Sequence, residues 1–577
     1  MKNYRSLLAI ILLIATLLTA VACTPSGDPA ETTGSGESTG APETTAPEEK
    51  ILLFSDEAWQ RKIIRAEYWN NNEFSVTMKI VDALEELTGT RPKLGMDFKR
   101  KDEVYDSTIP EILFGYTAYP ESREVYSTLA LGEGAIRVIG QKIVIAGYSY
   151  EALFELYEHI TDLFEKNYKD GKIEVTAAEL ETKVEVDNFL NSIPVPKDVT
   201  FSSIENCGYD QSLFIFEDAT ADTFKDYKSR MSSFTLVSES EESGNCFASF
   251  NAGKNLVNIS YSKHDDNFRI IINKNKQGTS LFEKKEIKKV CEPMILMHGL
   301  SWNGEHQNGL CLLIRLSDGS FIVVDGGFNR DKDASDLYNL LVKHTPEGMK
   351  PTVAAWFITH AHGDHHATFA NKFVAKYKLK VDIKSVIFNP PSAALNQTEN
   401  NEGGGAGNVI AAANSITGCE WVRCHVGDKY YIGDAEVDML YTIDYQYPTT
   451  FTYYNTCSII FSVKIAGQRI MVTGDGANSS FAKVVGMFGA DLKADILQVA
   501  HHGYGTGVSE SASTAVVQAY KHISPTLVLW PIGPDGYKSV EGKMYNQVLF
   551  QLPSVKEIVV AEDKDFLYDL PYVYTKK

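Results

Sequence analysis

Hydrophobic residues form one long run near the start of the chain and short segments in the rest of it. The long run, Leu7–Ala20, follows Lys2 and Arg5. Its length is typical of a signal-peptide core and is short for a helix that spans a membrane. Residues 24–50 contain mainly Thr, Ser, Gly, Pro and Glu and have almost nothing to bury. We therefore expect residues 1–23 to be a signal peptide and residues 24–50 to be a disordered tether.

Two segments with different patterns follow the tether. Residues 51–192 alternate the strand-like runs ILLFS, EILFG and AIRVIGQKIVIAG with the helix-like runs FSVTMKIVDALEELTG and SYEALFELYEHITDLFEKNY. This alternation predicts a small α/β accessory domain. Residues 198–288 place the helical stretch TADTFKDYKSRMSSF before the strand candidates NCFASFN, NLVNISYS and FRIIINK. That order predicts a second, α+β accessory domain.

Residues 294–577 consist of short apolar strands separated by turns rich in Gly and Asp. The strand candidates include CLLIRL, SFIVVDGG, VAAWFITH, RIMVTGD and ILQVAHHG. Strands that end in GG, GD or HHG deliver polar side chains to one edge of a sheet, where α/β enzymes place their sites. The pattern by itself predicts an α/β domain with a site at that edge.

Composition narrows the range of partners. The chain has 577 residues, too many for one hydrophobic core, and its 55 basic and 75 acidic residues give a net charge of −20. An acidic surface repels phosphate backbones, so we do not expect nucleic acid as a partner. The eight cysteines have no framework spacing. We interpret them as scattered buried thiols, with a Cys419–Cys424 bridge as the alternative.

The stretch THAHGDHH, residues 359–366, contains four of the 13 histidines. In an extended chain, residues i and i+2 point the same way, so His360 and His362 can bind one cation. Gly363 permits a tight turn, after which Asp364 and His365 can face a second cation. Imidazole and carboxylate ligands without thiolate favour zinc, with manganese or iron as alternatives. His366 points the other way and is expected beside the ligands.

This stretch resembles the HxHxDH motif of the metallo-β-lactamase superfamily. The resemblance covers Met294 to Lys577, because SFIVVDGG, RIMVTGD and ADILQVAHHG follow the order of the supporting strands of that family. It implies a C-terminal αββα sandwich with two divalent metal ions between its sheets, preceded by the two accessory domains. The implied metal ligands are His360, His362, Asp364, His365, Asp475 as a bridge, and His502, with His501 as the alternative to His502.

One part of the family pattern is missing. A third histidine normally reaches the first metal between the motif and the bridging aspartate, and this chain has only His425 there. Because the surrounding CHVGDKYYIGDAEV resembles a strand pair, we expect His425 to be structural. The family position falls near Tyr454 and Asn455, so Asn455 or water is the expected substitute ligand.

The run from NTCSIIFSVKIAGQRIMVTGD to ADILQVAHHGYGTG resembles the branch that contains the competence-protein hydrolase domain and phosphorylcholine esterase. This resemblance implies an enzyme that hydrolyses phosphodiesters with a metal-bound hydroxide. Asp364 and Asp475 would have catalytic roles, and His501 or Tyr504 would protonate the leaving group. The alternatives are an extracellular nuclease, a lactone or thioester hydrolase, and a non-catalytic metal-binding lipoprotein.

The N-terminal segments suggest where the protein acts. Ala20-Val21-Ala22-Cys23 resembles a bacterial lipobox, which implies lipid on Cys23 and a membrane anchor on the outer face of the cytoplasmic membrane; an ordinary signal peptide is the alternative. The substrate would then be a small-molecule or polymer ester in the cell envelope or outside the cell.

EILFGYTAYPES loosely resembles an α/β domain found beside glycan-active modules of secreted bacterial proteins. With the expected membrane tether and an envelope substrate, residues 51–288 would position the enzyme against that polymer, with an envelope glycan as the expected partner. Four aromatic residues could stack on sugars, although packing within the core is the alternative for each. They are Tyr68, Trp69, Tyr116 and Tyr119.

Overall fold

The structure is a computed structural model that describes residues 49–67, 71–99, 104–302, 305–306, 308–392, 404–449, 453–509, 511, 513–561 and 564–576. The expected signal peptide, its Cys23 and nearly all of the tether lie outside this part of the chain, as do Tyr68 and Trp69. Within it, no helix has both the length and the apolar character needed to cross a membrane.

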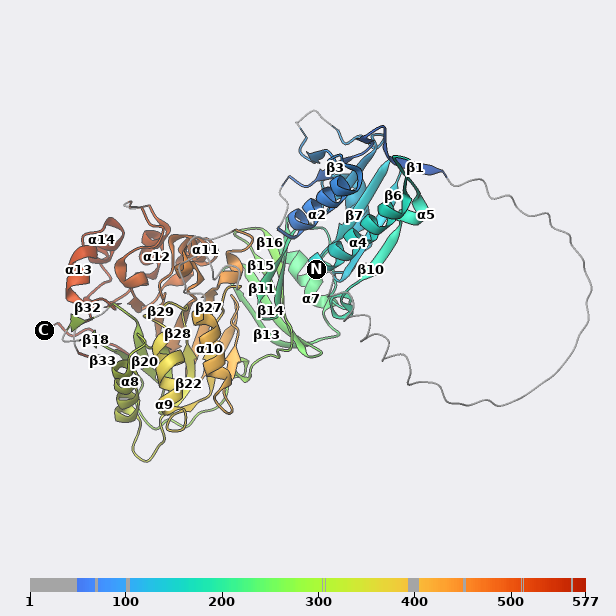
Figure 1. Ribbon diagram of the computed structural model, residues 1–577. Helices are drawn as coiled ribbons and strands as arrows, with labels where there is room; N and C mark the ends of the chain where they lie inside the picture. The colour runs from blue at the N-terminus through green and yellow to red at the C-terminus, as the bar shows by residue number, and fades with distance from the viewer. Residues whose placement is uncertain are drawn as a thin grey trace, which may run out of the picture. The chain divides into compact units, whose positions relative to one another are not determined.

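Residues 50–192 form two sheets with two long helices packed on them (Figure 1). The larger sheet has the order β10 (Thr182–Glu185), β6 (Glu133–Ile139), β7 (Lys142–Gly147), β5 (Glu111–Phe114), β3 (Lys62–Arg65) and β4 (Leu94–Met96). The smaller has the order β2 (Ala58–Trp59), β1 (Lys50–Ser55), β9 (Lys172–Thr176) and β8 (Tyr168–Lys169). The helices are α2 (Asn71–Thr88), α3 (Pro120–Tyr126), α4 (Tyr150–Asn167), α5 (Ala177–Leu180) and α6 (Asn188–Asn191).

Helical spacing of apolar residues explains how α4 packs. Leu153, Leu156, Ile160 and Phe164 recur every three or four positions, so they lie on one face of the helix. That face is buried in one cluster with residues of α2, β5 and β7. The mixture of strands and helices expected from the sequence is confirmed.

Residues 200–273 form a six-stranded antiparallel sheet. Its order is β11 (Thr200–Gly208), β12 (Gln211–Glu217), β16 (Asn267–Asn273), β15 (Asn255–Ser262), β14 (Asn245–Ala252) and β13 (Thr235–Glu242). Alternate residues of a strand point to opposite faces. Phe214 and Phe216 pack with helix α7 (Ala221–Arg230) and with residues of the preceding α/β part. Leu213 and Ile215 instead share a core with residues after 294. Strands β14, β15 and β16 of this sheet are therefore buried on both faces.

Residues 294–569 contribute two further large sheets (Figure 1). The first has the order β25 (Glu420–Val422), β24 (Ser385–Ile387), β22 (Thr352–Phe357), β21 (Phe321–Asp325), β20 (Cys311–Arg315), β17 (Met294–Met297) and β33 (Phe566–Asp569), with β23 (Asp382–Ile383) beside β22. The second has the order β26 (Lys429–Ile432), β27 (Ala435–Tyr441), β28 (Ile460–Ile465), β29 (Gln468–Val472), β30 (Ile496–Gln498), β31 (Leu527–Trp530) and β32 (Glu557–Val560). A two-residue hairpin pairs β18 (Ser301–Trp302) with β19 (Glu305–His306).

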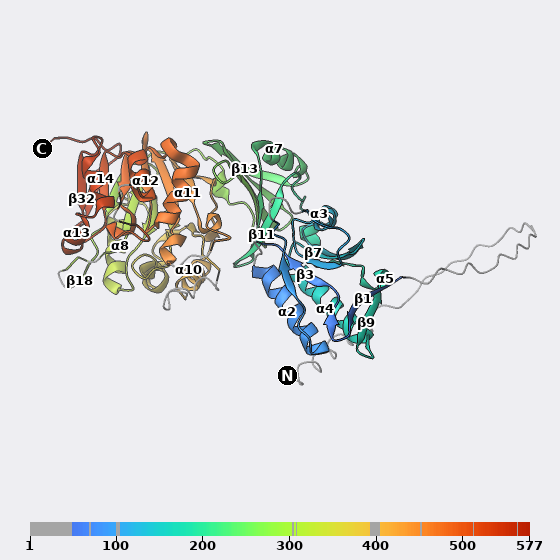
Figure 2. The same cartoon turned by 90° about the horizontal axis from the view of Figure 1, so that it is seen from above.

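These two sheets face each other, and helices cover their outer sides (Figure 2). Ile322 and Val324 of β21 belong to the core between the sheets, where the rings of Phe357 and Phe461 stack with centroids 4.4 Å apart. The outer side of the first sheet packs on α8 (Asp331–His344), α9 (Val374–Tyr377) and α10 (Gly404–Asn414). That of the second packs on α11 (Asn478–Phe488), α12 (Ala515–Ile523), α13 (Pro534–Val540) and α14 (Met544–Gln551).

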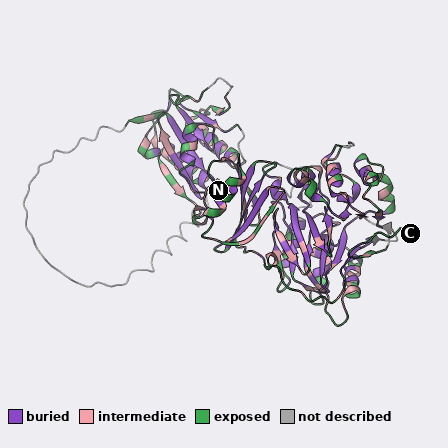
Figure 3. Cartoon of the chain, turned by 180° about the vertical axis from the view of Figure 1, so that it is seen from behind, coloured by how far each residue is buried: buried purple, intermediate pink, exposed green. Residues whose placement is uncertain are grey.

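Burial on both sides explains why these strands are continuous apolar runs (Figure 3). Strands β21 and β22 are parallel to each other, as are β29, β30 and β31. Their carboxyl ends therefore bring several polar residues to one edge of the paired sheets. These residues are Asp325, the histidine motif 359–366, Asp475 and the pair His501–His502.

The antiparallel sheet of residues 200–273 meets the later sheets through a buried carboxylate, Asp444. Its two oxygens accept hydrogen bonds from Gln211 Nε2 and Asn389 Nδ2, both at 2.7 Å, and Asp444 Oδ2 lies 2.7 Å from His425 Nδ1. The other ring nitrogen of His425 lies 3.0 Å from Asn273 Nδ2. His425 thus belongs to this interface. The described cysteines are free thiols, and five of the seven are buried, so Cys419 and Cys424 form no bridge.

Acid should weaken this interface. Burial raises the pKa of Asp444, but His425 and Arg423 outweigh burial and lower the pKa to about 2, below its ordinary value of 3.8. The ionised carboxylate therefore stabilises the fold above about pH 4, and this stabilisation is lost as pH falls toward about 2. The free energy of unfolding should differ between wild type and Asp444→Asn by about 2 kcal/mol more at pH ~5 than at pH ~2.

Denaturant unfolding at the two pH values measures this difference. Asp222→Asn is the control, because the Asp222 side chain is 90% exposed. Its effect should stay constant with pH. An equally constant effect for Asp444→Asn would contradict the assignment.

Candidate metal centre

Asp325, at the end of β21, holds the start of the histidine motif. Its carboxylate accepts hydrogen bonds from the backbone N–H of Thr359 at 2.8 Å and from the Thr359 hydroxyl at 2.7 Å. Nδ1 of His365 lies 2.8 Å from Asp325 Oδ2. This contact orients the His365 ring and leaves Nε2 for a ligand. The sequence interpretation assigned no role to Asp325, although its position at the end of SFIVVDGG was a usable signal.

Three residues form a first group of ligand atoms. Nε2 of His360 lies 2.9 Å from Nδ1 of His362 and 3.9 Å from Oδ2 of Asp475. His360 is fully buried. Burial, together with the neighbouring His365 and His362, lowers the pKa of His360 well below its usual value. The ring is therefore neutral, which is the form that binds metals.

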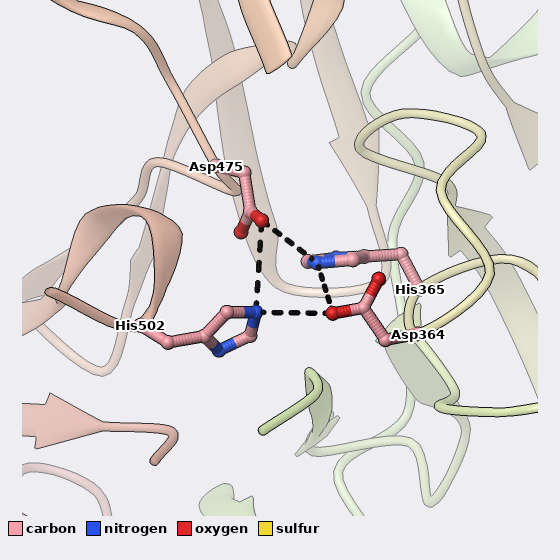
Figure 4. Close-up of side chains that lie close together, drawn as sticks. All are labelled: Asp364, His365, Asp475 and His502. Carbon is pink, nitrogen blue, oxygen red and sulfur yellow. Dashed lines mark ion pairs between the residues drawn. The ribbon is translucent and has the colours of Figure 1, made fainter. Parts of the chain in front are cut away.

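Asp475 also belongs to a second group, with Asp364, His365 and His502 (Figure 4). Oδ2 of Asp475 lies 3.2 Å from Nε2 of His365 and 3.6 Å from Nε2 of His502. Oδ2 of Asp364 lies 3.4 Å from the same nitrogen of His502. The four ligand atoms lie within 4.8 Å of one another. One buried carboxylate thus takes part in both groups.

The second group stabilises positive charge. Burial lowers the pKa of His365 and of His502, but the carboxylates of Asp475 and Asp364 outweigh burial and raise both. Burial in turn raises the pKa of Asp475, yet the adjacent histidines lower it well below its usual value. Two carboxylates in a buried site that favours positive charge are suited to a divalent cation.

The donor atoms fit such a cation. Nε2 of His365, Nε2 of His502 and Oδ1 of Asp475 are buried and make no hydrogen bond. Buried polar atoms without a hydrogen bond are rare, and here three of them belong to residues of one group. Imidazole nitrogen and carboxylate oxygen are zinc ligands, and neither group contains a thiolate. The residues therefore fit two divalent cations that share Asp475.

Both histidines of the HHG turn have a left-handed backbone conformation, and their rings contact different partners. His501 has φ +46° and His502 has φ +51°, a conformation that residues other than Gly rarely adopt. Nδ1 of His502 lies 2.7 Å from the carbonyl oxygen of Pro531, which aims Nε2 at the second group. Nδ1 of His501 instead lies 2.7 Å from Thr506 Oγ1. Its Nε2 is 3.9 Å from Asp475 Oδ2, beside both groups but in neither.

Asn455, the expected substitute ligand, lies next to His501. Its Nδ2 donates to Thr506 Oγ1 at 2.8 Å and lies 3.2 Å from His501 Nε2. Its Oδ1 is buried without a hydrogen bond. Within the described residues the imidazole and carboxylate ligands of the first group are His360, His362 and Asp475, and Asn455 stays a predicted substitute ligand.

The other predicted residues lie outside both groups. Nδ1 of His366 is 2.8 Å from the carbonyl oxygen of His362, so His366 supports the motif from behind. The Tyr504 side chain is partly exposed, and its hydroxyl accepts a hydrogen bond from Asn308 Nδ2 at 2.8 Å. The ring of Tyr454 lies over the first group, with its centroid 5.4 Å from that of His362. The sequence interpretation gave Tyr454 no role.

No family model and no curated protein matches the sequence. Among solved structures, a variant of CmlA beta-hydroxylase from Streptomyces venezuelae is 13% identical, with a TM-score of 0.31, and the match covers 49% of this chain and 55% of that one. The chain therefore spans about half the length of that protein. The metallo-beta-lactamase fold protein YhfI from Bacillus subtilis is also 13% identical, with a TM-score of 0.31, and the match covers 48% of this chain and 100% of that one.

A protein described as a metal-dependent hydrolase from Parabacteroides distasonis is 13% identical, with a TM-score of 0.25, and the match covers 57% of this chain and 98% of that one. At TM-scores this low, the likeness identifies neither the family nor the activity of this chain.

The substitution Asp325→Asn should weaken metal binding by the second group. The amide would present an N–H₂ group where Thr359 or His365 now finds an acceptor, so the His365 ring would lose its fixed orientation. Loss of such a supporting contact costs about 10- to 100-fold in metal affinity. Zinc competition with a chromophoric chelator measures this change. Asp336→Asn, in a partly exposed ion pair with Lys332, is the control. Equal zinc affinity of both variants would refute the role of Asp325.

Proposed function

We propose that this chain is a binuclear metal-dependent hydrolase of the metallo-β-lactamase superfamily that cleaves a phosphodiester. One observation carries the proposal: the buried Asp475 carboxylate belongs to two groups of ligand residues at the shared edge of two facing sheets. The HxHxDH spacing and the helix–sheet–sheet–helix layers support the family assignment. The Asn-x-x-Ser strand start and the HHG turn support the phosphodiesterase branch.

The residues of the chain divide into ligands and neighbours. His360, His362 and Asp475 would hold one cation, and Asp364, His365, Asp475 and His502 the other, with zinc preferred over manganese or iron. When bound, the cations supply Lewis-acid charge and activate water. The side chain of Asp364 is 26% exposed, so it is the second-group residue that solvent and substrate reach. His501 and Tyr504 lie next to the ligands and are the candidates for protonating the leaving oxygen.

The expected location and the net charge of the chain favour one class of substrate. The signal-peptide core and the lipobox-like Cys23 support a lipid anchor on the outer face of the bacterial cytoplasmic membrane. A small-molecule or polymer ester of the cell envelope is then the substrate class. The net charge of −20 disfavours long nucleic acids.

Metal content and hydrolysis test this proposal together. Protein beginning at about residue 51 should bind two equivalents of zinc or manganese and hydrolyse bis-p-nitrophenyl phosphate or p-nitrophenyl phosphorylcholine. Asp475→Asn removes the charge that both cations share and should lower turnover at least about a hundredfold. Asp438→Asn changes a buried aspartate on β27 that belongs to neither group, and this variant should retain turnover.

The outcomes separate the alternatives. One equivalent of metal or less, with neither ester hydrolysed, would contradict the proposal. Cleavage of DNA that falls steeply with added salt would identify a nuclease, because nucleic-acid binding depends strongly on salt. Hydrolysis of a lactone or thioester without phosphodiester cleavage would reassign the substrate. Bound metal without any turnover would leave a binding role.

We further propose that residues 50–273 bind a sugar of an envelope glycan, because a cavity of about 300 Å³ lies there. It opens at the carboxyl ends of β3, β4 and β5. Strands β4 and β5 lie on opposite sides of β3, so the connections after β3 and after β4 run in opposite directions along the sheet. Ligands bind at such points in α/β sheets, where the strand order reverses. The cavity is lined by Ala66, Glu67, Glu73, Asp97, Tyr116, Ala118, Arg123, Thr200, Phe201, Ser202 and Glu217.

A buried carboxylate, Asp97, holds the walls of this cavity in place. Asp97 accepts hydrogen bonds from the backbone N–H groups of Glu67 and Ala118, both at 2.7 Å. The Arg123 guanidinium lies 3.7 Å from the ring centroid of Tyr116. Carboxylates, a guanidinium and hydroxyls together suit a ligand rich in hydroxyl groups. Tyr119 is buried against Tyr105 and does not line the cavity.

Titration with N-acetylglucosamine, followed by NMR, tests the sugar site. Arg123→Gln should weaken binding at least about tenfold, as expected for a lost charged hydrogen bond. Arg137→Gln, on β6, is the control because Arg137 does not line the cavity. No chemical-shift change with wild type, or equal binding by both variants, would contradict the proposal.

A further inference from the structure

Arg269, on β16 of the antiparallel sheet, holds a segment of the chain that leads to the candidate metal centre. Its guanidinium donates to the carbonyl oxygen of Asp444 at 2.7 Å and to that of Tyr447 at 3.1 Å. The Arg269 side chain is buried and lies over the ring of Tyr445, 4.8 Å from its centroid. Without this guanidinium, both carbonyl oxygens would lose a donor in a buried interface.

Two more strands of the same sheet bind the same segment. Gln211, on β12, donates to Asp444 Oδ1 at 2.7 Å. The hydroxyl of Tyr445 lies 2.9 Å from the hydroxyl of Ser260, on β15. Three strands of the sheet thus contact residues 444–447 through buried polar groups.

Apolar packing continues this support to the metal ligands. Leu213, Ile215 and Ile271 of the antiparallel sheet belong to the same buried cluster as four residues of the segment, one residue of the histidine motif 359–366 and the residue directly before that motif. The four are Ile443, Tyr447, Tyr454 and Cys457, and the other two are Ala361 and Ile358.

The far end of the segment lies against the first group. Tyr454 and Asn455 belong to a short helix, η5 (Tyr454–Cys457), which precedes β28. Tyr454 is fully buried, and its ring faces those of His362 and His360 with centroids 5.4 and 6.5 Å apart. Asn455 Nδ2 contacts His501 at 3.2 Å. Movement of this helix would therefore change the surroundings of the first group more than those of the second.

We infer that the antiparallel sheet of residues 200–273 is part of the catalytic unit, with Arg269 and Gln211 as positioning residues for the first metal site. They hold the described residues 443–449 and 453–457 so that Tyr454 lies against His360 and His362. The inference rests on the proposed function, since it requires that the first group binds a cation.

Cobalt and zinc titration of protein that contains residues 50–577 tests this role. Arg269→Met should weaken binding at the first group at least tenfold and leave the second group within about twofold, because Tyr454 of η5 lies against His362 and His360 of the first group. His362→Ala, which lacks a ligand of the first group, identifies the corresponding step in the titration. Arg269→Lys keeps a donor and should recover part of the affinity.

Two further variants complete the comparison. Arg230→Met is the matched control, since Arg230 lies on α7 of the same part of the chain and contacts Asp226 and Val195. It should bind both cations like wild type. Gln211→Leu should weaken cation binding at the first group about threefold. This variant tests the inference if Arg269→Met does not fold.

Measurement of kcat adds a second readout, which distinguishes a positioning role from a general loss of folded protein. With turnover present, Arg269→Met should lower kcat at least tenfold, whereas a general loss of folded protein would lower active-enzyme concentration without changing metal affinity per folded molecule. Wild-type affinity at both steps, or equal weakening of both, would overturn the inference. If wild type binds two cations and hydrolyses no ester, the proposed function fails, and the two binding steps still decide this inference.

Discussion

The candidate site depends on a single buried carboxylate, Asp475, which belongs to both sets of ligand residues. Desolvation opposes a buried anion, and the adjacent His365 and His502 offset that penalty by holding positive charge. Those histidines come from different sheets, so the site exists only because the two sheets meet at one edge. The apolar core between them, including the stacked Phe357 and Phe461, maintains that meeting point.

Supporting contacts make the site rigid. Each of the second-group histidines has its other ring nitrogen fixed: His365 by Asp325 and His502 by the carbonyl oxygen of Pro531. In the first group, Nδ1 of His360 likewise lies 3.1 Å from the Thr359 hydroxyl, and packing adds a second kind of support. His360 and His362 lie beneath Tyr454, whose position depends on packing that extends to residues of the antiparallel sheet. The two groups therefore differ in how their geometry is maintained.

The histidine motif could be predicted from the sequence because its geometry is local: residues two apart in an extended chain share a side. The strands were predictable too, since burial on both faces leaves nearly uninterrupted apolar runs. The choice between His501 and His502 was not, because it depends on two left-handed residues that the sequence does not mark. The contact of Asp325 with His365 joins positions 40 apart, and that of Gln211 with Asp444 positions 233 apart. Composition and periodicity carry no signal for such pairs.

The two-sided burial of the antiparallel sheet affects the order of folding. Ribosomes make this sheet before its partner, and domains generally fold in the order of synthesis. Its face with Leu213, Ile215 and Ile271 stays in water until the chain has been made as far as Cys457. An apolar face exposed for that long favours aggregation, and contacts this distant in sequence form slowly. Burial of this face, and with it completion of the fold, therefore waits for the synthesis of residues 294–457.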